Sequence, residues 1–297
     1  MNIKILRFGI DVGGTKTEGV ILDADGRELF RERVATDRSS YRSVLAGVES
    51  VYRRMCDDAR GAPHTLGIGT PGAISARTGL LKNSNTTCMN GMPVLGDLGT
   101  LFGRGFALEN DANCFALAEA LHGAGRGKRF VFGVIMGTGC GGGLVIDGRV
   151  HRGLQLIAGE WGHTSIDPAG PSCYCGSRGC VETYISGSGL ERRYAELGGE
   201  PLGVEAIVAG ARMGDARGTA VMDEFFARLG RALANLIAVL DPDVVVLGGG
   251  LSNIDELYSH GVAEVARCVF SDSLETPIVR NELGDSAGVI GAALVGV

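Results

Sequence analysis

The sequence F-G-I-D-V-G-G at residues 8–14 has a counterpart in F-G-V-I-M-G-T at residues 132–138. The correspondence continues from G-V-I-L-D at residues 19–23 to G-L-V-I-D at residues 143–147. Each copy predicts a strand, a glycine turn, a second strand, an Asp-Gly turn and a third strand. A repeat this long is not a solenoid. It predicts two related lobes, each of which presents one glycine hairpin to a cleft between them.

The rest of the chain alternates between short apolar strands and segments with helical spacing, which predicts an α/β fold. In the first half we expect strands at residues 3–12, 18–22, 28–34, 64–70 and 106–109, with helices at residues 40–60 and 114–121. In the second half we expect helices at residues 219–240, 253–269 and 286–297 and a strand at residues 244–247. The two lobes are expected to span residues 1–118 and 119–297, with the final segment, 285–297, packing back on the first lobe.

Composition restricts the class of protein. Of the 297 residues, 45% are hydrophobic and 21% are charged, which is typical of a globular protein with a large core. The net charge of −6 and the pI near 5.5 predict no surface for nucleic acid. No apolar run reaches the ~20 residues of a membrane helix, and the N-terminus lacks a signal-peptide pattern. We therefore expect a cytoplasmic protein whose eight cysteines are reduced and able to bind metal.

A histidine and three cysteines form a metal-ligand pattern within A-G-E-W-G-H at residues 158–163 and C-Y-C-G-S-R-G-C-V-E at residues 173–182. Three thiolates and one imidazole make a closed tetrahedral set, which predicts a structural zinc site. The expected ligands are Cys173, Cys175, Cys180 and His163, and the histidine is supported only by its position. Unconnected thiols and a disulfide framework are the alternatives. The close spacing of the cysteines argues against the first, and the lack of a secretion signal argues against the second.

The two glycine turns predict a phosphate site, because successive backbone N–H groups form an anion nest. Threonine hydroxyls add further donors, and the residues concerned are Gly13, Gly14, Thr15, Lys16, Thr17, Gly137, Thr138 and Gly139. Asp11, at the end of its strand, is expected to hold Mg²⁺ directly or through water. The stretch G-T-G-C-G-G at residues 137–142 matches G-x-G-x-x-G, but a strand follows it instead of a helix, which argues against a nicotinamide site. The P-loop pattern is absent as well, so a nucleotide would be bound by the hairpins.

Asn110 and Asp111 lie where a predicted strand gives way to a helix. One of them suffices to cap the helix, so Asp111 is predicted to be a catalytic carboxylate beside the phosphate turns. The helix N-terminus is expected to keep Asp111 ionised and weakly basic, which is enough for phosphoryl transfer. Glu160 and Glu182 flank the metal-binding loop. Together with Asn110 and His163 they predict a site for the hydroxyls of a small polyol.

In combination, these motifs resemble those of the ROK family (repressor, open reading frame, kinase) of bacterial sugar kinases over almost the whole chain. The matching motifs are D-V-G-G-T-K-T at residues 11–17, E-N-D-A-N at 109–113, M-G-T-G-C-G-G-G at 136–143, A-G-E-W-G-H at 158–163, C-Y-C-G-S-R-G-C-V-E-T at 173–183 and L-D-P-D-V-V-V-L-G-G-G at 240–250. The resemblance implies the actin-like, two-lobed fold of the hexokinase and actin type, with duplicated sheets and a zinc-binding loop. It also implies ATP and Mg²⁺ as co-substrates of a hexose, and a homodimer.

The resemblance further implies a role for each residue of the site. Asp111 corresponds to the catalytic base, and the ligands of the sugar hydroxyls correspond to Asn110, Glu160, His163 and Glu182, with His163 also on zinc. Two residues correspond to a turn that touches the sugar through its backbone, Pro71 and Gly72. A third glycine run corresponds to the adenosine loop and consists of Gly248, Gly249 and Gly250.

The choice of sugar is expected from a smaller set of residues. The loop N-S-N-T-T-C-M-N-G at residues 83–91 is similar to that of the fructokinase/mannokinase branch, so we expect fructose or mannose to be phosphorylated at O6. N-acetylglucosamine kinases of the family share E-N-D-A-N-C-F-A-L and G-H with this chain and stay an alternative, as does a glucokinase. Cys88 stands where a large aromatic is expected, and the smaller side chain would enlarge the sugar pocket. Trp161 replaces the commonest glycine, as it does in the fructokinase/mannokinase branch.

Two functions of other classes compete with a kinase. A sugar-sensing transcriptional regulator of the same family would add an N-terminal winged helix, whereas this acidic chain begins at its phosphate hairpin. A zinc-dependent hydrolase would keep an open coordination position with three protein ligands, whereas four ligands are expected here.

Overall fold

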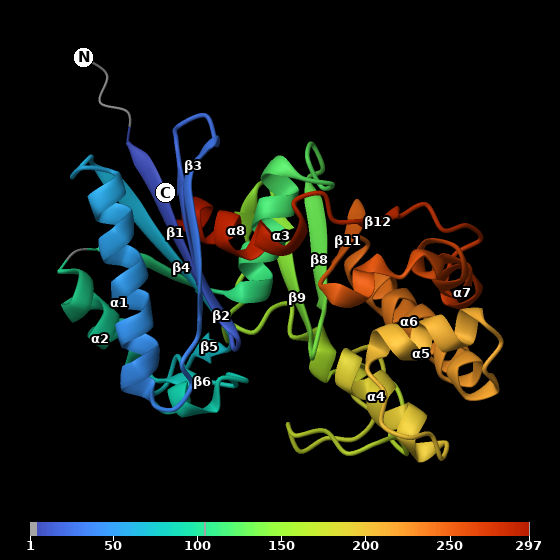
Figure 1. Cartoon of the computed structure of the whole chain (residues 1–297). Helices are drawn as coiled ribbons and strands as arrows, with labels where there is room; N and C mark the ends of the chain where they lie inside the picture. The colour runs from blue at the N-terminus through green and yellow to red at the C-terminus, as the bar shows by residue number, and fades with distance from the viewer. Residues whose placement is uncertain (1–4, 104, 297) are drawn as a thin grey trace.

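The computed structural model describes residues 5–103 and 105–296 and consists of two lobes that lie side by side (Figure 1). Each lobe is built on a five-stranded sheet, and helices α3 and α8 lie between the two sheets. None of the helices in the described part of the chain is long and apolar enough to cross a membrane.

The sheet of the first lobe has the strand order β3-β2-β1-β4-β7. Its strands are β1 (Leu6–Val12), β2 (Lys16–Leu22), β3 (Glu28–Ala35), β4 (His64–Thr70) and β7 (Ala107–Asn110), and a small separate sheet pairs β5 (Ala73–Ile74) with β6 (Leu81–Lys82). Strand β2 is buried almost throughout and β1 is buried at its centre, because α1 packs on one face of the sheet and α8 on the other.

The sheet of the second lobe repeats this arrangement with the order β10-β9-β8-β11-β12. Its strands are β8 (Phe130–Met136), β9 (Cys140–Ile146), β10 (Arg149–Val150), β11 (Val244–Gly248) and β12 (Ile278–Arg280). In both sheets an antiparallel hairpin is followed by parallel neighbours, which confirms the predicted duplication. The two hairpins differ by one residue in register, since Gly19 pairs with Ile10 whereas Gly143 pairs with Gly133.

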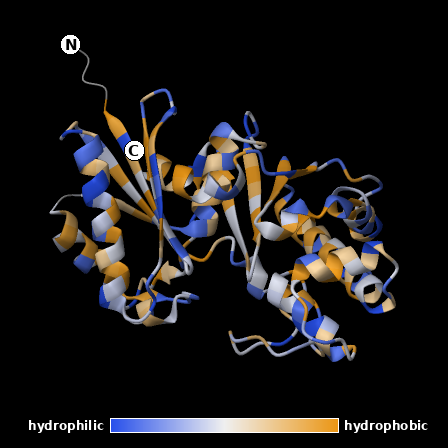
Figure 2. Cartoon of the chain, viewed as in Figure 1, coloured by the Kyte–Doolittle hydropathy of each residue, from blue (hydrophilic) through white to orange (hydrophobic). Residues whose placement is uncertain are grey.

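Helices lie on the outer faces of both sheets and in the space between the sheets. The longer ones are α1 (Tyr41–Asp58), α2 (Val94–Phe102), α3 (Asp111–His122), α4 (Gly187–Glu196), α5 (Val204–Arg212), α6 (Ala216–Leu240), α7 (His260–Cys268) and α8 (Ala287–Val295). Short 3₁₀ helices lie at Thr87–Met89, Trp161–His163, Val181–Thr183, Gly250–Asn253, Asp255–Tyr258 and Gly284–Ser286. The apolar stripe predicted on α6 faces the core of the second lobe, while hydrophilic residues colour the outer side of α1 (Figure 2).

Small residues allow α8 to pass close to its neighbours. A Cβ atom added to Gly291 would lie 1.8 Å from the carbonyl oxygen of Cys114 on α3, and one added to Gly67 on β4 would lie 1.9 Å from the carbonyl oxygen of Ala292. Val289 and Ala293 pack on Val20 and Leu22 of β2. The C-terminal helix thus forms part of the core of the first lobe.

Some elements differ from the sequence-based expectation. The helix expected at residues 253–269 is divided into a 3₁₀ turn at Asp255–Tyr258 and α7, because the backbone at Ser259 (φ −124°, ψ −75°) leaves the helical region. Three helices and three strands of the described residues have no counterpart in the prediction, namely α2, α4, α5, β5, β6 and β12. Residues 3 and 4 of the first expected strand, and residue 297 of the last expected helix, lie outside the described residues.

Candidate active site

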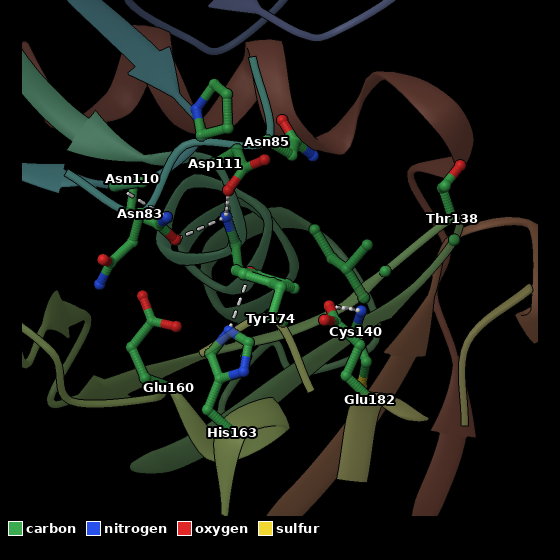
Figure 3. A pocket seen from close by; sticks show the side chains of 18 of the residues that line it. Asn83, Asn85, Asn110, Asp111, Thr138, Cys140, Glu160, His163, Tyr174 and Glu182 are labelled. Carbon is green, nitrogen blue, oxygen red and sulfur yellow. Dashed lines mark hydrogen bonds between the residues drawn. The ribbon is translucent and has the colours of Figure 1, made fainter. Parts of the chain in front are cut away.

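A cavity of about 440 Å³ opens between the two lobes and collects residues from widely separated parts of the sequence. Its first-lobe wall contains the turn at Pro71 and Gly72 and the start of α3. Its second-lobe wall contains the turn between β8 and β9 and the metal-binding loop. In Figure 3, Asp111 and Asn110 lie across the cavity from Glu160 and His163, with Glu182 and Thr138 to one side.

Asn110 and Asp111 divide two tasks at the start of α3. Asn110 caps the helix, since its Oδ1 accepts hydrogen bonds from the backbone N–H groups of Ala112 and Asn113. Its Nδ2 donates to the carbonyl oxygen of Gly72, which ties the helix to the neighbouring turn. Asp111 is therefore not needed as the cap, and its carboxylate faces the cavity.

The pKa of Asp111 differs from the expectation. The helix N-terminus was expected to make this carboxylate a weak base, but burial raises the pKa of Asp111 above its ordinary value. Hydrogen bonds from the backbone at Ala112 oppose this shift without cancelling it. Loss of hydration outweighs the helix end here, because α3 begins inside the interlobe cavity and not at a wet surface.

The turn between β8 and β9 is held by the N-terminus of α4 and by the metal-binding loop. Gly187 N–H donates to the carbonyl oxygen of Gly137, and the hydroxyl of Ser188 donates to that of Thr138. Glu182 accepts a hydrogen bond from the Cys140 N–H at 2.8 Å. This turn lines the cavity with glycine backbone and is reinforced by a helix N-terminus, the arrangement that favours a phosphate.

The turn between β1 and β2 lies at the edge of this cavity and does not line it. Gly14 is close to Asn85, one of the lining residues, and Gly13 N–H donates to the Lys16 carbonyl group. The Thr17 hydroxyl is buried against the hydroxyl of Thr36, so it is not free to bind a ligand, whereas Thr15 is exposed.

Asp11 has an unusual environment at the end of β1. Its Oδ1 is buried and has no hydrogen-bond partner in the described part of the chain. Burial, followed by the charges of Asp111 and Glu18, raises the pKa of Asp11 to about 7, and Lys16 opposes this shift. A buried carboxylate oxygen without a partner suits a hydrated cation.

Glu160 offers its carboxylate to the cavity, and no hydrogen bond to it is found among the described residues. Burial raises the pKa of Glu160, while His163 acts in the opposite direction. Trp161 anchors this loop, because its indole N–H donates to the carbonyl oxygen of Gly141 at 3.1 Å and its ring packs edge-on against Phe132. The tryptophan therefore links this loop to the start of β9.

The histidine and the three cysteines converge as expected for a metal site. His163 Nδ1 lies 3.6 Å from Cys173 Sγ, and Cys175 Sγ lies 3.6 Å from Cys180 Sγ. All four ligand atoms lie within 4.8 Å of one another. Tetrahedral zinc with bonds of about 2.3 Å separates its ligands by roughly 3.8 Å, so this donor set fits the ion. The other nitrogen, Nε2, lies 3.0 Å from the hydroxyl of Tyr174.

The third glycine run lies outside the cavity but adjoins it. Gly248 pairs with Ile135, a lining residue, and a Cβ atom added to Gly249 would lie 2.5 Å from the carbonyl oxygen of Met136. The run from Gly248 to Gly250 thus follows β11 directly beside the end of β8.

Sequence reasoning left several lining residues without a role. Asn83, Asn85, Tyr174 and Ser188 all line the cavity. The sequence could have indicated three of them. Asn83 and Asn85 occur in the loop at residues 83–91 that resembles the family, and Tyr174 lies between Cys173 and Cys175. Cys88, by contrast, packs on the core of the first lobe and lines no cavity at the site, so its small size does not enlarge the sugar pocket.

The chain is similar to known sugar kinases over almost its whole length. The chain is 38% identical over 300 residues to an N-acetyl-D-glucosamine kinase of Photobacterium profundum, covering 98% of this chain and 99% of that protein. It is 36% identical over 298 residues to the N-acetylgalactosamine kinase AgaK of Shewanella sp. (strain ANA-3), covering 97% and 96% of the two chains. The crystal structure of a ROK hexokinase from Thermus thermophilus superposes with a TM-score of 0.87 at 34% identity, covering 98% and 97%. The ROK family model matches residues 7–296, and the chain belongs to the ROK family.

Proposed function

We propose that this protein is an ATP-dependent kinase that phosphorylates N-acetylated hexosamines at O6, with N-acetyl-D-glucosamine as the first candidate. The observation that carries the proposal is the single cavity in which Asp111 meets the glycine turn after β8 and the carboxylates of Glu160 and Glu182. A base, a phosphate cradle and acceptors for sugar hydroxyls are the parts that phosphoryl transfer to a sugar requires.

In this mechanism Asp111 accepts the proton of the sugar hydroxyl while that oxygen bonds to the γ-phosphorus of ATP. The bond from this phosphorus to the bridging oxygen breaks at the same time, ADP leaves, and Asp111 later returns its proton to water. Burial raises the pKa of Asp111, which makes it a stronger base than an ordinary aspartate. The glycine turn and the N-terminus of α4 stabilise the negative charge that is transferred.

Asp11 is proposed to hold Mg²⁺, because its buried Oδ1 has no partner among the described residues. Mg²⁺ supplies charge neutralisation for the phosphates when it is bound. The turn between β1 and β2 is proposed to contact the same phosphates from the first lobe, and Gly248–Gly250 to contact the adenosine. Since these residues adjoin the cavity without lining it, they are expected to reach the nucleotide when the lobes close.

The identity of the sugar is inferred from the relatives and replaces the expectation of fructose or mannose. The curated relatives compared above are an N-acetylglucosamine kinase and an N-acetylgalactosamine kinase, and both align over almost the full chain. The loop at residues 83–91 had favoured fructose or mannose. A short loop is a weaker guide than an alignment of the whole chain, which includes every residue around the sugar.

Zinc is proposed to be structural in this enzyme. Its four protein ligands leave no open position for a reacting water, which disfavours a zinc hydrolase. His163 lines the cavity and is also one of the four ligands, and Tyr174 lines it between two of the cysteines, so the ion would fix the loop that presents Glu160 and Glu182 to the sugar.

The test is a coupled ADP-release assay with a panel of N-acetylglucosamine, N-acetylgalactosamine, N-acetylmannosamine, glucose, fructose and mannose. We expect kcat/KM for an N-acetylated sugar to exceed that for fructose and mannose by at least about tenfold. A preference for fructose or mannose would restore the original expectation, and no ADP release with any sugar would contradict the kinase.

A further inference from the structure

A second cavity of about 240 Å³ adjoins the sugar cavity, and the two share Gly72 and Asn110 in their walls. Apart from these, its lining is mostly aliphatic and includes Ile74, Leu81, Leu95 and Leu108 of the first lobe with Leu156 of the second. We propose that this second cavity, called here the acyl pocket, receives the N-acyl group of the sugar, so that its walls select N-acylated over unsubstituted hexoses. This inference rests on the proposed function.

The shared edge of the two cavities suits an amide. The carbonyl oxygen of Gly72 accepts one hydrogen bond from Asn110 Nδ2, and each of these groups has capacity left. A carbonyl oxygen accepts two hydrogen bonds, and an amide nitrogen donates two. The N–H of an acylamino group can therefore donate to Gly72, and its C=O can accept from Asn110, at the place where the polar cavity meets the apolar one.

The backbone at this edge is tightly fixed. Gly72 has a φ of +86°, and an added Cβ atom would lie 2.4 Å from the carbonyl oxygen of Lys82. Only glycine fits here without strain, so the orientation of its carbonyl group is set by the fold. Asn110 is fixed in turn by its role as the cap of α3. Preorganised partners of this kind give specificity at little entropic cost.

The buried carboxylate at the acyl pocket is neutralised. Glu109 is buried, and its Oε2 forms an ion pair with Arg152 of the second lobe at 2.5 Å. Its Oε1 accepts from the Asn110 N–H and from Asn113 Nδ2. Because the charge of Glu109 is compensated by these partners, no unpaired charge faces an apolar group in the acyl pocket. The aliphatic side chains of the walls then determine which substituent binds.

The volume of the acyl pocket indicates how long an acyl chain it can hold. About 240 Å³ is several times the roughly 30 Å³ of one water molecule, so an acetyl group leaves much of the space unfilled. Longer acyl chains should then be accepted. Each added methylene that is fully buried contributes about 0.8 kcal/mol, which lowers KM by up to about fourfold.

The experiment compares N-acetyl-, N-propanoyl- and N-butanoylglucosamine as substrates of the full-length protein. For the unmodified chain we expect kcat/KM for the N-butanoyl sugar within about threefold of that for the N-acetyl sugar, or above it. Ala73→Leu and Leu156→Trp narrow the acyl pocket from opposite lobes, and each should lower the butanoyl-to-acetyl ratio at least about tenfold through overpacking. Leu197→Trp is the matched control, because Leu197 is as exposed as Leu156 (36% against 37%) but lies at the far end of α4.

The outcomes separate the inference from the proposed function. Two results would overturn the acyl pocket and leave the proposed kinase intact. The first is a kcat/KM for the N-butanoyl sugar more than about thirtyfold below that for the N-acetyl sugar. The second is a butanoyl-to-acetyl ratio of kcat/KM that neither Ala73→Leu nor Leu156→Trp changes. Activity on unsubstituted hexoses alone would overturn the proposed substrate class and the acyl pocket with it. Calorimetric binding of the three sugars without ATP gives the same comparison independently of turnover.

Discussion

At the start of α3 the chain assigns capping and chemistry to adjacent residues. Asn110 satisfies the first N–H groups of the helix, and Asp111 is left with a carboxylate that faces the cavity. Burial then raises the pKa of Asp111, which suits a base that must take a proton from a sugar hydroxyl.

Replacement of this base tests its role. Asp111→Asn keeps the size of the side chain and removes the proton acceptor, so kcat should fall by about 10²–10⁴-fold while the calorimetric Kd for the sugar changes little. In the unmodified protein kcat/KM should fall as pH decreases through the raised pKa of Asp111, because the protonated carboxyl cannot accept a proton. Asp272→Asn, an exposed surface change, serves as the control. Turnover within a few-fold of normal would remove Asp111 from the mechanism.

The proposed cation site at Asp11 is expected to cost stability when no cation is bound. Its pKa is raised from 3.8 to about 7, so the folded protein binds a proton between these values that the unfolded chain releases. Stability from this group is therefore present below the unfolded pKa and is lost as pH rises towards 7.

The corresponding substitution should be stabilising at high pH. Asp11→Asn removes the titration, so the variant should gain stability relative to the unmodified protein by about 2 kcal/mol more at pH 8 than at pH 5. Thermal unfolding without Mg²⁺ and nucleotide at the two pH values measures this difference. An equal effect at both values would show that Asp11 is ionised throughout.

The loop with the four candidate metal ligands also carries residues of the proposed sugar and phosphate sites. Cys173, Cys175 and Cys180 hold one end of it, Trp161 anchors the other on Gly141, and Glu182 reaches the Cys140 N–H. Such a loop transmits the loss of one metal ligand to residues that do not touch the metal.

Cys175→Ser should therefore weaken both metal and sugar binding. Metal analysis should find less than one zinc per chain, and the Kd for the sugar should rise about tenfold or more because Glu160 and Glu182 lose their fixed positions. Cys268→Ser is the control, since Cys268 is also an exposed free cysteine but lies at the end of α7. Intact sugar binding after zinc loss would favour a catalytic ion over a structural one.

On the scale of the whole molecule, α3 and α8 join the two lobes. Helix α8 comes from the end of the chain, yet it packs on β1, β2 and β4 of the first lobe and crosses α3 at Gly291. The interlobe cavity lies at the N-terminal end of α3, so this helix crossing supports the site as well as the core.

Two glycine substitutions compare this crossing with an open position. Gly291→Ala places a Cβ atom 1.8 Å from the carbonyl oxygen of Cys114, and the overpacking should cost about 3 kcal/mol, or roughly 6 °C in Tm. Gly47→Ala in α1 meets nothing within 4 Å and should stabilise by up to about 1 kcal/mol through helix propensity. Calorimetry of both variants checks the contrast. A tolerated Gly291→Ala would mean that α8 does not cross α3 at this distance.

The sequence by itself determined the two similar β-hairpins with their glycine turns, the cluster of one histidine and three cysteines, and the pair Asn110 and Asp111. These features are local, since each depends on the order of residues along one strand, turn or short loop. The helix expected at residues 253–269 is interrupted at Ser259, where the backbone leaves the helical region, and the spacing of apolar residues did not indicate this break.

Only the tertiary structure decided which residues share a cavity and how strongly each carboxylate is buried. The raised pKa values of Asp111 and Asp11, the lining residues Asn83 and Ser188, and the acyl pocket between the lobes all depend on contacts between distant segments. Hydration and packing depend on the folded molecule, because the two walls of the cavity come from segments that are far apart in the sequence.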